Sequence, residues 1–230
     1  MIPIQAVASV VELIVLFPAF RFESAEKYLK SRQEGLVQEA TSHTKEALKH
    51  RITWMSAVYL LLYVGTESTI SGWVVLFMTR ARHTSPRMAS ITSSGFWTGT
   101  ALGRLTLGFV TDRVGVTFAA AVYLICCMTL ELGFAFVDSP LPSAVLISLL
   151  GFFMGPLFPS SIVVLTQRLP GELHIAAVSF VASVGQVGGA LLPYGLGVMI
   201  ELLEIRVFPV IIITQLALTF IVWIAISKLT

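Results

Sequence analysis

Long apolar segments separated by short polar ones make up most of this chain. Seven of them are long enough to cross the hydrocarbon core of a bilayer, about 30 Å thick, as α-helices. They are Ile2–Ala19, Trp54–Met78, Ala89–Thr111, Val116–Val137, Ser143–Thr166, Ile175–Ile200 and Val207–Ile226. The pattern predicts an all-α fold, a polytopic membrane helix bundle of about seven transmembrane helices.

The segments differ in how evenly apolar they are. The second, fourth and seventh are the plainest, whereas Gly, Pro and polar residues interrupt the others, which is typical of helices that line something other than lipid. Pro156 and Pro159 in the fifth predict a kink. The first has no basic stretch before it, and its positive charges follow it, which favours a membrane helix over a cleaved signal peptide.

A polar stretch, residues 21–51, separates the first segment from the other six. It contains Glu–Lys pairs at i and i+4 and apolar residues on approximately one face. An amphipathic helix along the membrane surface is one interpretation, and a solvated linker is the other. The stretch divides the chain into a single transmembrane helix (1–20), an amphipathic loop (21–51) and a six-helix transmembrane bundle (52–230).

The uneven distribution of Lys and Arg predicts the orientation of the bundle. Eleven fall on the side of the 21–51 loop and four on the other. The larger group is Arg21, Lys27, Lys30, Arg32, Lys45, Lys49, Arg51, Arg104, Arg113, Arg168 and Lys228, and the smaller is Arg80, Arg82, Arg87 and Arg206. We therefore expect a cytoplasmic loop and C-terminus and an external N-terminus, with the plasma membrane as the default location.

Composition supports the membrane class and narrows the function. The chain is 56% hydrophobic and 12% charged, with a mean hydropathy of +0.86, whereas soluble domains carry about 25% charged residues. A net charge of +2 gives no reason to expect a nucleic-acid partner. Cys126 and Cys127 are adjacent in an apolar run, and no metal-ligand, phosphate-loop or hydrolase motif occurs. We expect no metal, no cofactor and no enzymatic activity.

A glycine-rich motif lies between the third and fourth segments, where residues 103–115 read GRLTLGFVTDRVG. Gly108 and Gly115 are expected to let backbones approach closely where two helices turn. Asp112 can accept hydrogen bonds from helix N-terminal amides or pair with a cation. Arg113 is expected to face the cytoplasm.

This motif, G-x-x-x-D-R-x-G, resembles the loop between the second and third helices of each six-helix half of major facilitator superfamily transporters. The basic pair usual in the first half is replaced by Val116 and Thr117, which suits a second half. Residues 63–73 (YVGTESTISGW), 151–170 (GFFMGPLFPSSIVVLTQRLP) and 179–201 (SFVASVGQVGGALLPYGLGVMIE) look like helices 7, 10 and 11 of the fucose-permease-like branch and of similar fungal proteins. The chain thus resembles a C-terminal half, helix 6 to helix 12: one six-helix half plus one extra helix.

The resemblance implies transmembrane transport of a small polar solute, with sugars favoured, by alternating access. The family binds its solute between two six-helix halves, so this chain would be part of a larger or incomplete carrier. A second membrane chain would then supply the missing half, and membrane lipid is the other expected partner. The alternative is a non-transporting truncated membrane protein that associates with a full-length carrier.

Glu67 is the most informative candidate residue because an acid within a transmembrane segment is costly and usually functional. Tyr63 and Ser71 share its helix face and can form a polar stripe with it. Contact with solute hydroxyls, proton coupling and a structural hydrogen bond to another helix are all open. Glu131 and Gln215 are interpreted as structural.

Three further residues are candidates for solute contact. Trp97 offers a flat apolar face beside polar neighbours, which suits a sugar ring. Gln186 lies mid-segment, where its amide needs partners in a cavity or on a facing helix. Tyr194 follows Pro193 in a glycine-rich segment that either lines the cavity as a bent helix or simply packs closely.

Overall fold

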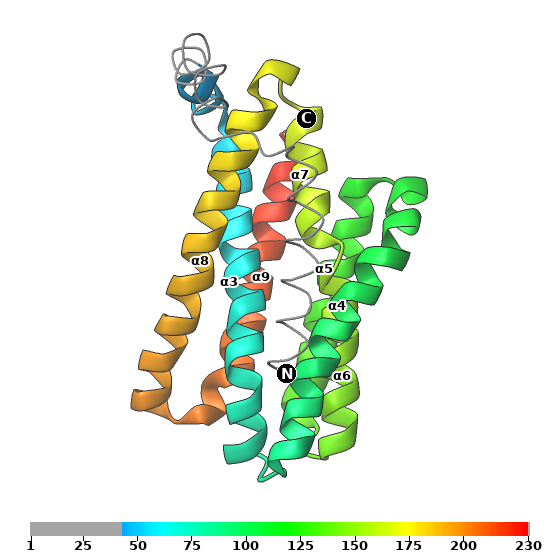
Figure 1. Cartoon of the computed structure of the whole chain (residues 1–230), viewed down its shortest axis with the longest axis vertical. Helices are drawn as coiled ribbons and strands as arrows, with labels where there is room; N and C mark the ends of the chain where they lie inside the picture. Colours follow the sequence, from blue (N-terminus) through cyan, green and yellow to red (C-terminus); the bar gives the residue numbers. More distant parts are fainter. Residues whose placement is uncertain (1–42, 230) are drawn as a thin grey trace, which may run out of the picture. The chain divides into compact units, whose positions relative to one another are not determined.

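The computed structural model describes residues 43–229, so the first predicted span and most of the 21–51 loop lie outside the described residues. Residues 44–229 belong to one structural unit, whose regular secondary structure is helical (Figure 1). Its elements are α3 (Arg51–Arg80), α4 (Pro86–Val114), α5 (Val116–Phe136), α6 (Pro140–Met154), α7 (Leu157–Gln167), η1 (Gly171–Leu173), α8 (His174–Leu203), η2 (Ile205–Val207) and α9 (Phe208–Ser227).

Five segments of the described part are long and apolar enough to cross a membrane. They are Arg51–Arg80, Val116–Phe136, Pro140–Gln167, Gly171–Leu203 and Ile205–Ser227. The predicted span Ala89–Thr111 is also helical, within α4, but its Ser, Thr and Gly residues and Arg104 keep it out of this set. The predicted fold class, an all-α membrane helix bundle, is confirmed.

Helix α3 lies at the centre of the packing, in contact with α8, α9, α4 and α7 (Figure 1). Aromatic side chains fill the spaces around it. Near one end, the Phe77 ring lies 5.4 Å from that of Phe134 and 5.1 Å from that of Phe208, centroid to centroid. Toward the other end, the rings of Tyr59 and Trp223 are 5.0 Å apart. These contacts tie α3 to α5 and α9 at two levels.

Glycines set how closely two helix pairs approach. A Cβ at Gly99 of α4 would overlap the carbonyl oxygen of Ser148 in α6, and one at Gly188 of α8 would overlap that of Leu61 in α3. Small residues of this kind allow close packing without a hydrophobic driving force in lipid. Of the two interpretations of the glycine-rich segment 179–201, close packing therefore accounts for Gly188.

The predicted kink in the fifth span is confirmed. That span is divided into α6 and α7 at Gly155 and Pro156. Proline has no N–H to donate to the preceding turn and its ring clashes with that turn. Pro159 likewise cannot donate to the carbonyl of Gly155, four residues earlier. The break therefore leaves carbonyl groups in the middle of the bundle for other side chains to use.

Candidate functional site

Glu67 lies in the middle of α3 and is 12% exposed. Its Oε1 atom is 3.4 Å from Nη2 of Arg104 on α4, so the two side chains form an ion pair. The hydroxyl of Tyr63, one turn earlier on α3, lies 3.4 Å from the same oxygen. Tyr63 and Glu67 thus share a polar face as predicted, and a guanidinium from another helix offsets the carboxylate charge.

The helix break positions both partners of Glu67. Tyr63 Oη donates to the carbonyl of Met154, the last residue of α6, at 3.0 Å. Arg104 Nε donates to the carbonyl of Gly155 at 3.3 Å, the group that Pro159 cannot bond. The last carbonyls of a helix need partners from outside it. The kink thus holds the Tyr63 hydroxyl and the Arg104 guanidinium beside Glu67.

The position of Arg104 corrects one prediction. We expected it among the cations on the side of the 21–51 loop, near that end of its helix, but it lies ten residues before α4 ends at Val114, which is about 15 Å along the helix. It pairs with Glu67 rather than with headgroups or solvent at a helix end. Without Arg104, ten Lys and Arg residues fall on the side of the 21–51 loop and four on the other, so the excess that predicts the orientation is retained.

A pocket of about 430 Å³ opens beside this pair. Its walls come from α3, α4, α7 and α8 and consist of Val64, Glu67, Arg104, Phe158, Pro159 and Gln186. Glu67 accepts hydrogen bonds, Arg104 donates them, and the Gln186 amide can do either. Phe158 and Pro159 add apolar surface. The combination suits a small solute with hydroxyl groups and an apolar face.

Gln186 is the predicted candidate that the fold brings to Glu67 from another helix, although the two are 119 positions apart in the sequence. Four other candidates, Tyr63, Ser71, Trp97 and Tyr194, do not line the pocket. The hydroxyl of Ser71 donates to the carbonyl of Ser68 on its own helix at 3.2 Å. Trp97 is 48% exposed and Tyr194 is 72% exposed.

The glycine-rich motif forms the turn between α4 and α5. Gly115 is the single residue between them and has φ +98°, a conformation that side chains disfavour, so backbone geometry explains this glycine. No heavy atom of the described part would meet a Cβ on Gly108 or Gly115, so the close approach predicted for them is not found within residues 43–229. Asp112 is exposed and makes no side-chain hydrogen bond or ion pair with residues 43–229, so its predicted partners are absent there.

A second charged cluster lies outside the pocket, around the turn from α3 to α4. Arg82 donates to Ser143 Oγ and to the carbonyl of Phe134, and its guanidinium carbon lies 4.1 Å from the centre of the Phe134 ring. Burial lowers the pKa of Arg82, while nearby Asp138 and Glu131 oppose that shift. Glu131 is fully buried, and its carboxylate oxygens have no hydrogen-bond partner within the described residues. The role of Glu131 stays a prediction.

Sequence reasoning missed Arg104, Phe158, Pro159 and Val64 as pocket residues. A cation within an apolar segment is as costly as an acid, so Arg104 carried the same signal as Glu67. The register of α4 against α3, which brings the two together, is not visible in either helix alone. Groups of three or more His, Cys, Asp or Glu side chains that could hold a metal are absent from the part of the chain that the structure describes.

Comparison with known proteins places this chain in a family. The sequence model of the Major Facilitator Superfamily matches residues 55–229. The chain is 30% identical to "Bypass of stop codon protein 6" of Saccharomyces cerevisiae, over 94% of this chain and 49% of that protein. It is 24% identical to the "Glucose/mannose transporter GlcP" of Bacillus subtilis, over 60% of this chain and 34% of that protein.

Solved structures give the same fold. A single-substitution variant of the E. coli fucose:proton symporter FucP superposes with a TM-score of 0.70 and 17% identity, covering 81% of this chain and 45% of that one. FucP in the outward conformation superposes with a TM-score of 0.74 and 17% identity, covering 97% of this chain and 54% of that one. The chain thus spans about half the length of FucP and of the yeast relative, as the predicted half-transporter would. The chain belongs to the Major Facilitator Superfamily.

Proposed function

We propose that this chain forms one half of a carrier that moves a small polar solute, with sugars the favoured class, across a membrane. The observation that supports this most is the pocket in which Glu67, Arg104 and Gln186 meet from three different helices. The relatives named as a glucose/mannose transporter and a fucose:proton symporter favour a sugar over other polar solutes.

The Glu67–Arg104 ion pair can be closed, when the pocket is empty, or replaced by contacts with solute. Without solute, the carboxylate and guanidinium satisfy each other at 3.4 Å, a separation longer than that of a strong charge-assisted hydrogen bond. Solute hydroxyls can replace this contact, donating to Glu67 and accepting from Arg104, while Gln186 adds a third polar contact. Phe158 provides an apolar surface for the C–H face of a ring.

Alternating access requires a second half facing this pocket, because carriers of this kind bind solute between two repeats near the midplane. A longer protein or a second membrane chain would provide that half. The proposal keeps the predicted orientation, in which the Arg51 end of α3 faces the cytoplasm, and the plasma membrane as the location.

Uptake of labelled hexoses in cells that lack their own hexose carriers tests the proposal. Cells that express this chain together with a co-expressed first half are expected to accumulate sugar above the empty-vector level. Glu67→Gln is expected to lower that uptake while surface abundance holds. If no solute is taken up and the chain instead co-purifies with a full-length carrier, the non-transporting alternative replaces the proposal.

A further inference from the structure

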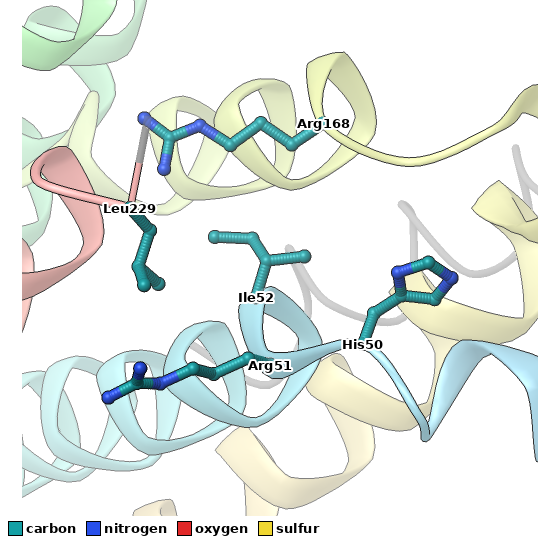
Figure 2. Close-up of a pocket in the computed structure, with 5 residues that line it drawn as sticks. All are labelled: His50, Arg51, Ile52, Arg168 and Leu229. Carbon is teal, nitrogen blue, oxygen red and sulfur yellow. The ribbon is translucent and has the colours of Figure 1, made fainter.

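A second pocket, away from Glu67, lies at the end of the bundle where α3 begins. Its volume is about 370 Å³, and Figure 2 shows the five residues that line it: His50, Arg51, Ile52, Arg168 and Leu229. Arg51 and Arg168 extend from different helices on opposite sides of Ile52 (Figure 2). Two of the five side chains are guanidinium groups, one is an imidazole, and none is acidic.

The pocket lies where membrane-spanning helices end. Helix α3 begins at Arg51, α7 ends at Gln167 and α9 ends at Ser227. Trp54, at the first turn of α3, is 52% exposed, and its Nε1 donates to the carbonyl of Leu48 at 2.9 Å. Indole rings with one wet and one apolar side are typical of the membrane–water interface. The pocket is therefore at the depth of lipid headgroups.

The cations of this pocket are not neutralised by acids of the described part. Arg51 makes no side-chain hydrogen bond or ion pair with residues 43–229. Arg168 donates one hydrogen bond from Nη1 to the Ile226 carbonyl at 2.5 Å, which orients the guanidinium. Its other N–H groups can donate to a ligand. Glu46 is already paired with Lys49 at 2.9 Å, and that ammonium holds the pKa of Glu46 below its usual value.

These features specify an anionic, amphiphilic ligand. Guanidinium groups match the oxygens of phosphate with paired N–H donors. Basic pockets between membrane helices bind the phosphate-bearing headgroups of lipids. Ile52 and Leu229 add apolar surface that a free inorganic anion would not use but a lipid could. We propose that this pocket binds the phosphate of an anionic phospholipid headgroup.

Native mass spectrometry of the purified full chain, titrated with phosphatidic acid or with phosphatidylcholine, tests the proposal. The wild type is expected to bind phosphatidic acid preferentially. Arg51→Gln removes an exposed side chain without hydrogen bonds to residues 43–229, so folding is expected to be unaffected. Arg51→Gln/Arg168→Gln together are expected to weaken binding roughly 10- to 30-fold. Arg206→Gln is the matched control, an exposed arginine next to the start of α9, at the opposite end of that helix.

Further measurements distinguish a lipid phosphate from free inorganic phosphate, and loss of binding from loss of folding. Inorganic phosphate at millimolar concentration is expected not to displace the lipid, and its displacing phosphatidic acid would assign the pocket to a soluble anion instead. Arg168→Lys keeps the charge but loses the paired N–H donors, so it is expected to bind phosphatidic acid less tightly than the wild type and more tightly than Arg51→Gln/Arg168→Gln. Equal affinity of the wild type and Arg51→Gln for phosphatidic acid, or equal losses in Arg51→Gln and Arg206→Gln, would overturn the proposal.

Discussion

Replacing Arg104 by Gln removes the charge that offsets Glu67 in the middle of the bundle. Removing one partner of a fully buried pair costs about 3–5 kcal/mol, whereas an exposed pair contributes about 0–1 kcal/mol. Glu67 is 12% exposed and Arg104 is 49% exposed, so this pair lies between the two cases. We expect Arg104→Gln to lower the free energy of unfolding by roughly 1–3 kcal/mol.

A double-mutant cycle isolates the pair from the other contacts of Arg104. Glu67→Gln removes the carboxylate charge, so Arg104→Gln is expected to cost less in that background. The predicted coupling energy is about 1 kcal/mol. It is measured by reversible unfolding of the purified protein in mixed detergent micelles, followed by far-UV circular dichroism.

Arg113→Gln is the matched control, because Arg113 lies on the same helix, is exposed and pairs with no carboxylate of residues 43–229. It is expected to change the free energy of unfolding by less than about 0.5 kcal/mol. A coupling energy below about 0.3 kcal/mol between the Glu67 and Arg104 substitutions would refute the pair as an energetic unit.

Three further substitutions test the packing by the same unfolding measurement. Gly99→Leu pushes α4 away from the backbone of α6 and is expected to lower the free energy of unfolding by roughly 3 kcal/mol. Gly108→Leu is its control, because a side chain there meets open space and is expected to be tolerated. Equal losses in the two variants would contradict the glycine contact. Gly115→Ala strains a residue with φ +98° and is expected to cost about 1–2 kcal/mol, so an unchanged stability would argue against this turn. Tyr63→Phe leaves a buried carbonyl of the α6 end unpaired at a cost of about 1–3 kcal/mol, and no loss would mean that the bond is not made.

Most of the fold could be predicted from the sequence, because each apolar segment must form its own helix to satisfy its backbone in lipid. Proline chemistry likewise located the break between α6 and α7. Helix α4 is less apolar than the other spans, because close packing at small residues such as Gly99 takes the place of large apolar side chains there. Local patterns therefore sufficed for helices but not for their depth or partners.

The site was predictable only in part. Glu67, Tyr63 and Gln186 were identifiable because polar groups at membrane depth need partners, and all three lie at or beside the pocket. Trp97 and Tyr194 are exposed and do not line this pocket, so their contact with solute stays a prediction. Pairing of Arg104 with Glu67 depends on the register of α4 against α3, which is a tertiary feature and cannot be predicted from the sequence of either helix alone.

Equilibrium binding of labelled sugars to the purified chain tests the central claim, that the pocket beside Glu67 holds a polar solute. The wild type is expected to bind at least one hexose, and Glu67→Gln and Gln186→Ala are each expected to weaken that binding about tenfold, as loss of one hydrogen bond to a charged or polar partner would. Ser71→Ala, on the same helix but outside the pocket, is expected to bind like the wild type. Equal affinity in all four proteins, or loss only in Ser71→Ala, would contradict the account.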